Sequence, residues 1–205
     1  MSKKKPLIVF EGIEGSGKTT LINYIANYFK KRKIDFIKLR EPGGNKNSEK
    51  IRKIILDKKS KFNSFTDLML YFAARSENIE KVINKNYGKK IILMDRFVDS
   101  TLAYQHYGMN LDKDLINKIN KILLKKIKPS IIFLNTINMK TLIKRLSVRK
   151  NKNRYDNFKI KFYRDVQNGY IKISKKESNY IVIDSNKDLI ENKKKVLNNI
   201  LKFIS

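Results

Sequence analysis

The sequence predicts an α/β fold with a five-stranded parallel sheet and helices on both of its faces. Two observations lead to this prediction. Five short apolar runs recur along the chain, and segments with the periodicity of helices separate them. Crossover helices of this kind place strands side by side in parallel, in a sheet that is covered on both faces. The expected strands are 7–10, 35–39, 90–94, 131–134 and 180–183.

Helical periodicity covers most of the remaining chain. In the last segment Val196, Leu197 and Ile200 fall on one face, which predicts core packing and nothing more. With 205 residues, 41% of them hydrophobic, and no repeat or Pro/Gly/Ser-rich linker, the chain suits a single domain, 1–205. The expected helices are 18–32, 48–57, 65–86, 98–107, 112–127, 139–149, 158–176 and 188–203.

Composition excludes several kinds of site. The chain has no cysteine, which excludes disulfides, thiolate metal ligands and a cysteine nucleophile, and which fits a reducing cytoplasm. No apolar run approaches the roughly 18 residues of a membrane span. The lysines after Ser2 precede an apolar run that is too short for a signal peptide. We therefore expect a cytoplasmic protein with no membrane partner.

The chain is strongly basic, since 47 Lys and Arg residues stand against 19 Asp and Glu residues and give a formal charge of +28. Such an excess attracts phosphate backbones without sequence specificity, so a nucleic-acid binder is one interpretation. Coding bias is the other, because Lys, Asn and Ile are abundant together and the lysines are spread along the chain. The spread favours the second interpretation, and we expect no specific nucleic-acid partner.

The first strand leads into a glycine-rich loop and a helix with the pattern G-x4-G-K-T. Glycines permit backbone conformations in which successive N–H groups point at phosphate oxygens, beside the positive end of the helix. Lys18 supplies a mobile charge for the β- and γ-phosphates, and the Thr19 hydroxyl can bind Mg²⁺. A strand–helix turn can match this pattern by chance, but the apolar run before it and the periodic face after it favour a P-loop NTPase fold. The expected ATP-binding residues are Gly12, Ile13, Glu14, Gly15, Ser16, Gly17, Lys18, Thr19 and Thr20.

Charged residues directly follow two other strands, where ligands bind in parallel sheets. Arg40 precedes a Pro-Gly-Gly turn and can bind a phosphate, although a surface arginine before a turn is common. Asp95 ends an apolar strand, as does the carboxylate that holds Mg²⁺ in P-loop proteins. Arg96 beside it suits an anionic ligand. The helix that follows opens with polar residues facing the same end of the sheet: Ser100, Thr101, Tyr104 and Gln105.

Two helical segments add candidate ligand contacts. Tyr71 and Arg75 are four residues apart and share a helix face, where a ring can stack on a base and a guanidinium can bond its edge. The alternative is a core aromatic residue next to a surface arginine. Further along, a basic run contains Arg145, Arg149 and Arg154. Such runs are usually solvated, but in P-loop proteins mobile arginines close over the transferring phosphoryl group.

Together these motifs resemble those of thymidylate kinases, specifically the bacterial type. The resemblance runs nearly end to end. It implies a homodimeric cytoplasmic enzyme that transfers the γ-phosphoryl group of ATP to dTMP, with Mg²⁺, to give dTDP in dTTP biosynthesis. The matching motifs are 10–20 (FEGIEGSGKTT), 40–44 (REPGG), the Tyr71 and Arg75 pair, 95–105 (DRFVDSTLAYQ), the basic run ending in Arg154-Tyr155-Asp156, and Gly169-Tyr170.

The resemblance also implies roles for single residues. Arg40 and Arg96 would hold the dTMP phosphate. Tyr71, where the family usually has Phe, would stack on thymine while Arg75 reads its edge. Glu14 would lie near the deoxyribose, and Ser100, Thr101, Tyr104 and Gln105 would complete the dTMP pocket.

Catalysis would rest on Lys18, on Asp95 as a metal ligand with Thr19, and on an arginine. Because Ser16 stands in the loop, that arginine is expected from a mobile lid, about 145–157. Arg149 is the first candidate because it lies at the expected tip, and Arg145 and Arg154 are the others.

The chain departs from the family pattern outside the nucleotide pockets. Asp156 stands where Glu is usual and Asn135 where Asp is common, and Asp165 and Gln167 replace arginines. Two other functions stay open: another P-loop nucleoside monophosphate or deoxynucleoside kinase, and an ATP-binding protein associated with nucleic acid. The arginines after the strands favour an acceptor that already carries phosphate, because a nucleoside would leave them unpaired.

Overall fold

The computed structural model describes residues 4–150 and 152–204, so residues 1–3, 151 and 205, including Ser2 and Lys3 of the expected basic start and one lid residue, lie outside it. Five parallel strands form one sheet in the order β2-β3-β1-β4-β5. This confirms the predicted sheet, with each strand within about two residues of its expected bounds. The strands are β1 (Leu7–Gly12), β2 (Phe36–Arg40), β3 (Ile91–Asp95), β4 (Ile131–Thr136) and β5 (Tyr180–Asp184).

The helices follow the predicted order but are less regular. Two expected long helices each contain a π-helical stretch, η1 (Ile79–Ile83) and η2 (Leu102–Gly108), and a short 3₁₀ turn, η3 (Arg154–Asp156), lies in the lid. Within the described ranges, no helix is long and apolar enough to cross a membrane. The helices are α1 (Lys18–Lys31), α2 (Lys46–Leu56), α3 (Ser64–Asn78), α4 (Asn84–Asn86), α5 (Val98–Thr101), α6 (Lys113–Leu124), α7 (Met139–Ser147), α8 (Ile160–Ser174) and α9 (Leu189–Ile204).

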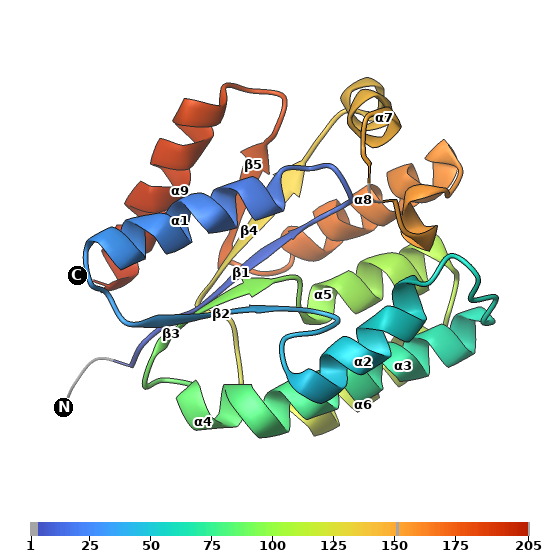
Figure 1. Ribbon diagram of the computed structural model, residues 1–205, viewed down its shortest axis with the longest axis horizontal. Helices are drawn as coiled ribbons and strands as arrows, with labels where there is room; N and C mark the ends of the chain where they lie inside the picture. The colour runs from blue at the N-terminus through green and yellow to red at the C-terminus, as the bar shows by residue number, and fades with distance from the viewer. Residues whose placement is uncertain (1–3, 151, 205) are drawn as a thin grey trace.

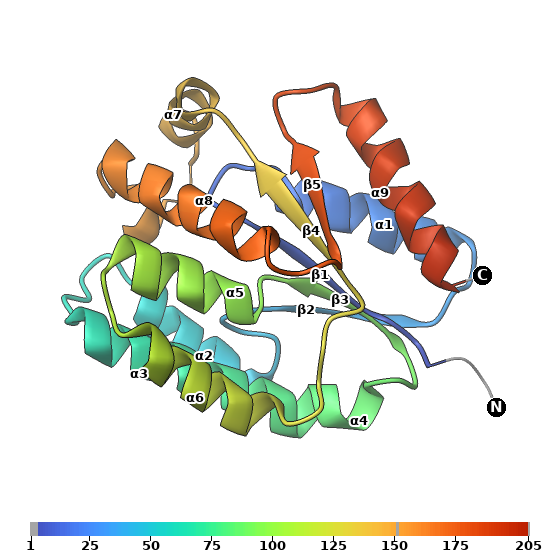
Figure 2. The same cartoon turned by 180° about the vertical axis from the view of Figure 1, so that it is seen from behind.

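The central strand β1 is buried along its whole length because its side chains alternate between two cores. Ile8 and Phe10 point to the face covered by α1 and α9 (Figure 1). Leu7 and Val9 point to the other face, where Ile79 of η1 packs. Figure 2 shows this second face, with α3 and α6 side by side. An apolar strand covered on both sides is what the sequence run at this position predicts.

The strand register brings charged side chains together at the carboxyl edge of the sheet. Arg40 at the end of β2 pairs with Asp95 at the end of β3, and Asp95 also pairs with Phe10 of β1. On its other side β1 pairs with β4, so that Gly12 lies beside Asn135. The connections change direction around β1, which is where ligands bind in open parallel sheets.

Close packing of η2 against α8 shapes the wall beside this edge. A Cβ on Gly108 would lie 2.7 Å from the ring of Phe162 and 2.8 Å from Val166, so only glycine fits there. A π-helical stretch adds a residue to the turn and often occurs at functional sites. Here it carries Tyr104 and Gln105, both of which are buried.

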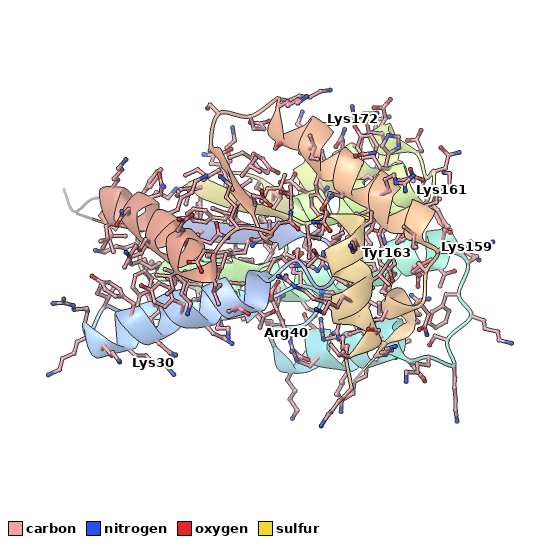
Figure 3. All side chains as sticks on the ribbon, turned by 90° about the horizontal axis from the view of Figure 1, so that it is seen from above. Lys30, Arg40, Lys159, Lys161, Tyr163 and Lys172 are labelled. Atoms are coloured by element: carbon pink, nitrogen blue, oxygen red, sulfur yellow. The ribbon has the colours of Figure 1, made fainter. Side chains whose placement is uncertain are left out.

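The basic side chains are distributed over the molecule. Lys30 on α1 lies at the opposite end of the view from Lys161 and Lys172 on α8 (Figure 3). One of these lysines is partly neutralised, since Lys161 pairs with Asp165 at 2.6 Å. The origin of the charge of +28 in composition stays a prediction.

Candidate active site

A cavity of about 670 Å³ opens at the carboxyl edge of the sheet. It brings together predicted residues from the P-loop, from the ends of β2 and β3, from α3 and from the lid. The predicted residues that line it are Glu14, Gly15, Lys18, Thr19, Arg40, Tyr71, Arg75, Asp95, Arg96, Ser100, Thr101, Tyr104, Gln105 and Arg149. Other predicted residues lie outside the lining: Gly12, Ile13, Ser16, Gly17, Thr20, Arg145 and Arg154.

The P-loop has the backbone that the motif predicts. Gly12 has a φ of 137°, and a Cβ there would lie 2.4 Å from the carbonyl oxygen of Asn135. Lys18 is buried, and its Nζ donates to the carbonyl oxygens of Gly12 at 2.8 Å and Ile13 at 2.9 Å. Burial, and secondarily the charge of Arg96, lowers the pKa of Lys18 to about 8. An anion near Lys18 would raise this pKa again, so the loop is built to receive negative charge.

Two hard oxygen ligands meet at the start of α1. The Thr19 hydroxyl donates to Oδ2 of Asp95 at 3.3 Å. The described part of the chain holds no cluster of three or more His, Cys, Asp or Glu side chains that would form a complete protein metal site. A hydroxyl and a carboxylate are nevertheless the donor set that suits Mg²⁺ when substrate phosphates and water supply its other ligands.

Arg96 lines the cavity and has a left-handed backbone conformation, with a φ of 67°. Its Nη2 donates to Oε1 of Glu14 at 2.8 Å and to the Tyr104 hydroxyl at 3.0 Å. Its Nη1 donates to the Tyr170 hydroxyl at 3.1 Å. The Tyr104 hydroxyl also donates to Glu14 at 2.5 Å, so the acidic residue of the P-loop and the arginine after β3 form one network. A non-glycine residue in this conformation persists only where its surroundings hold it.

Glu11 provides that support from beneath. Its side chain is fully buried and accepts hydrogen bonds from the Phe97 N–H at 2.8 Å, the Ser100 hydroxyl at 2.6 Å and the Tyr170 hydroxyl at 3.0 Å. Burial raises the pKa of the Glu11 carboxyl from 4.5 to about 7. These bonds connect β1 to Phe97, Ser100 and Tyr170, which surround Arg96. They therefore fix the direction of the Arg96 guanidinium.

Three arginines give one end of the cavity an excess of positive charge. Arg40 forms a two-pronged ion pair with Glu49, with Nε–Oε1 at 3.0 Å and Nη2–Oε2 at 2.8 Å. Arg52 donates to the carbonyl oxygen of Pro42 at 2.6 Å. Burial, followed by repulsion from Arg40 and Arg96, lowers the pKa of Arg52. A multiply charged anion bound between these side chains would relieve that repulsion.

The other end of the cavity carries neutral ring and amide groups around a buried arginine. Arg75 is 2% exposed and donates to Oε2 of Glu41 at 2.8 Å, to Asn120 at 2.8 Å and to Thr101 at 2.9 Å. The alternative of a surface arginine is therefore wrong. Nε2 of the buried Gln105, which also lines the cavity, has no hydrogen-bond partner among the described residues. A buried donor without a partner is costly unless a ligand supplies an acceptor.

The three lid arginines point to three different places. Arg149 lines the cavity, and its Nη1 donates to Oδ1 of Asp156 at 2.6 Å. Arg145 lies outside the P-loop, where it donates to the carbonyl oxygens of Gly15 at 2.8 Å and Ser185 at 3.2 Å. Arg154 binds Asp67 of α3. Of the three, all within the described ranges, Arg149 alone lines the cavity.

Several residues that line the cavity had no role predicted from the sequence. Glu49, Arg52 and Leu56 follow one another at helical spacing on α2 and share the face that lines the cavity, a signal present in the sequence. Glu41, in the loop after β2, gave no comparable signal, because its partner Arg75 lies on α3, 34 residues further along the chain. Tyr155 also gave no signal, because it lines the cavity only through the folded position of the lid turn η3.

Comparisons with known proteins agree with this geometry. The family model "Thymidylate kinase" matches residues 10–196. The thymidylate kinase of Sulfurihydrogenibium sp. is 38% identical over 187 residues, covering 90% of this chain and 91% of that protein. The thymidylate kinase of Acholeplasma laidlawii is 39% identical over 201 residues, covering 95% and 98%. The crystal structure of thymidylate kinase from Ehrlichia chaffeensis superposes with a TM-score of 0.78 at 30% identity, covering 97% of this chain and 99% of that one.

The buried Glu11 predicts a pH dependence of stability. Its folded pKa of about 7 lies above the ordinary 4.5, so its contribution to stability is complete below pH 4.5 and is lost as the pH rises through 7. Glu11→Gln removes this titration. Between pH 5 and pH 8 the free energy of unfolding of the wild type should therefore fall relative to that of the variant, by up to about 3 kcal/mol at 1.36 kcal/mol per pKa unit. Urea unfolding of both proteins across this range measures the difference, and parallel pH profiles would contradict the assignment.

Proposed function

The chain belongs to the thymidylate kinase family, a family of nucleoside monophosphate kinases that phosphorylate dTMP to dTDP, and from this premise we propose a role for each part of the cavity. One observation carries the proposal. Lys18 and Asp95, the P-loop and strand-end groups, share a single cavity with Tyr71 and Arg75 and with the lid residue Arg149. A donor site and an acceptor site that open into the same space suit direct phosphoryl transfer.

ATP is the proposed donor. The P-loop amides and Lys18 bind its phosphates, since the burial of Lys18 and its lowered pKa favour an anion beside it. Thr19 and Asp95 hold Mg²⁺, which supplies charge neutralisation on the phosphates when bound. The 3.3 Å approach of their oxygens supports this pairing, because both groups would then be available as ligands at one place.

The dTMP phosphate binds among Arg40, Arg52 and Arg96. Repulsion from Arg40 and Arg96 contributes to the lowered pKa of Arg52, which supports a bound dianion as the natural counter-charge. Glu49 pairs with Arg40 and keeps its guanidinium ordered at this end of the cavity. Arg52 thus joins the two arginines that the sequence predicts.

The thymine base stacks on Tyr71, and its edge is read by Arg75 and Gln105. The unpartnered Nε2 of Gln105 supports this role, because a base carbonyl would satisfy it. Glu41 holds Arg75 from behind through the 2.8 Å ion pair, so the guanidinium can be fixed before substrate arrives. Glu14 and Tyr104, linked at 2.5 Å, face the sugar, while Ser100 and Thr101 complete the pocket wall.

Arg149 is the proposed catalytic arginine. It lines the cavity, whereas Arg145 contacts the outside of the P-loop and Arg154 binds α3. Negative charge that develops on the transferring phosphoryl group needs a cation beyond Lys18 and Mg²⁺. Asp156 aims Arg149 through a 2.6 Å bond.

We propose a cytoplasmic homodimer as the working form. Ile122 on α6 is 70% exposed and Phe65 on α3 is 52% exposed. The two helices lie side by side on the outer face (Figure 2), and a second copy of the chain would cover these side chains. Sedimentation equilibrium of the wild type and of Ile122→Asp, which should weaken the association, tests this assembly.

A substrate panel tests the acceptor assignment. Uracil lacks one methyl group of thymine, and a single apolar group gives only about 10–200-fold discrimination. With ATP and Mg²⁺ we expect dTMP to be the best substrate, dUMP a measurable second, and dCMP, dAMP, dGMP and free thymidine poor. Equal kcat/KM values for dGMP and dTMP would contradict the base pocket, and efficient use of thymidine would contradict the arginine phosphate site.

Substitution of the lid arginines tests the source of the catalytic charge. Arg149→Ala should lower kcat far more than it raises the KM for dTMP, because the charge that it meets develops mainly in the transition state. A positioned arginine is worth roughly 10³–10⁵ in rate in other phosphoryl-transfer enzymes. Steady-state kinetics should compare Arg145→Ala, Arg154→Ala and, as a matched control on the exposed lid surface, Lys150→Ala. A loss of less than tenfold in kcat for all three arginines would mean that the lid only covers the site.

A further inference from the structure

One lid side chain, Arg154, binds both α2 and α3. Arg154 in η3 forms an ion pair with Asp67 of α3, and its Nε donates to the carbonyl oxygen of Ile55 in α2. The side chains of the pair are 15% and 4% exposed. Arg154 also lies 5.9 Å above the Phe62 ring. These contacts join the lid to the side of the cavity remote from the P-loop.

Asp67 receives its side-chain hydrogen bonds from the lid. One carboxylate oxygen accepts from Arg154, and the other accepts from the Tyr155 hydroxyl at 3.3 Å. With the lid in place the carboxylate is buried, and a buried carboxylate needs a paired charge. With the lid withdrawn it would lose both partners and return to water. The ion pair therefore stabilises the position of the lid in which Arg154 contacts α3.

The same turn connects the base end of the cavity with the catalytic arginine. The Tyr155 ring packs edge-on against Tyr71 of α3, at 6.2 Å between centroids, and against Tyr104, at 6.0 Å. One residue later, Asp156 accepts from the Asn153 N–H in the capping box of η3 and from Arg149. The turn η3 therefore contacts Tyr71 through Tyr155 and the guanidinium of Arg149 through Asp156.

We propose that Arg154 and Asp67 form a latch that docks the lid on α3 and thereby positions Arg149. The inference rests on the proposed roles of Tyr71 at the base and of Arg149 at the transferring group. Arg154 is then a positioning residue that acts through Asp156 and Arg149, and it makes no contact with the phosphates. Because Tyr155 packs against Tyr71, filling of the base pocket and docking of the lid support each other.

Kinetics of paired substitutions test the latch. Asp67→Asn and Arg154→Gln should each lower kcat/KM for dTMP at least tenfold, and the double variant should be no worse than the poorer single variant, because both remove one interaction. Arg154→Lys should recover part of the loss. Asp165→Asn, which removes the exposed pair with Lys161 on α8, is the matched control and should stay within twofold. Multiplying losses, or a loss confined to Arg154→Gln, would overturn the proposal and indicate that Arg154 acts on the phosphates.

A distance measurement tests docking without turnover. The chain has no cysteine, so Lys61→Cys and Asn157→Cys, both at exposed positions, introduce two unique sites for spin labels on either side of the latch. The wild-type background should give a narrow distance distribution with dTMP bound, and Asp67→Asn should broaden and lengthen it. An unchanged distribution in Asp67→Asn would overturn the latch whatever Arg149 does, whereas a failure of Arg149→Ala to lower kcat would leave this measurement intact.

Discussion

The buried carboxyl group of Glu11 organises the active site. Its three hydrogen bonds reach the Phe97 N–H, the Ser100 hydroxyl and the Tyr170 hydroxyl, so a single side chain of β1 joins the loop after β3, the start of α5 and the helix α8. A carboxyl group without access to water has to be bonded on all sides. Arg96 is held in its left-handed conformation within this bonded shell.

Charge balance in the cavity follows from this arrangement. Arg96 neutralises Glu14, and Arg40 neutralises Glu49, which leaves the half-buried Arg52 as a positive charge without a carboxylate of its own in the described structure. In the proposed function, specificity for a phosphorylated acceptor rests on these three arginines and their partners.

The three lid arginines contact different partners, although the sequence distinguished them only by the expected position of Arg149 at the lid tip. They lie within one basic run, and nothing in their spacing separates a cavity residue from a residue that binds the protein. The hydrogen-bond partners of the three arginines determine where each guanidinium lies. Arg145 meets backbone carbonyls of the P-loop and of the loop after β5, Arg149 meets Asp156, and Arg154 meets Asp67, which lies 87 positions earlier in the chain.

The sequence by itself determined the sheet, its strands and the P-loop, because hydrophobic periodicity and glycine backbone preferences act over a few neighbouring residues. It also determined which residue types follow the strands, and most of the predicted pocket residues do line the cavity. Only the tertiary structure decided the roles of Glu11, Glu41 and Asp67. Each of these is a charged side chain whose environment is supplied by elements far away in the sequence, and both the cost of its burial and the identity of its partner exist only once those elements have packed together.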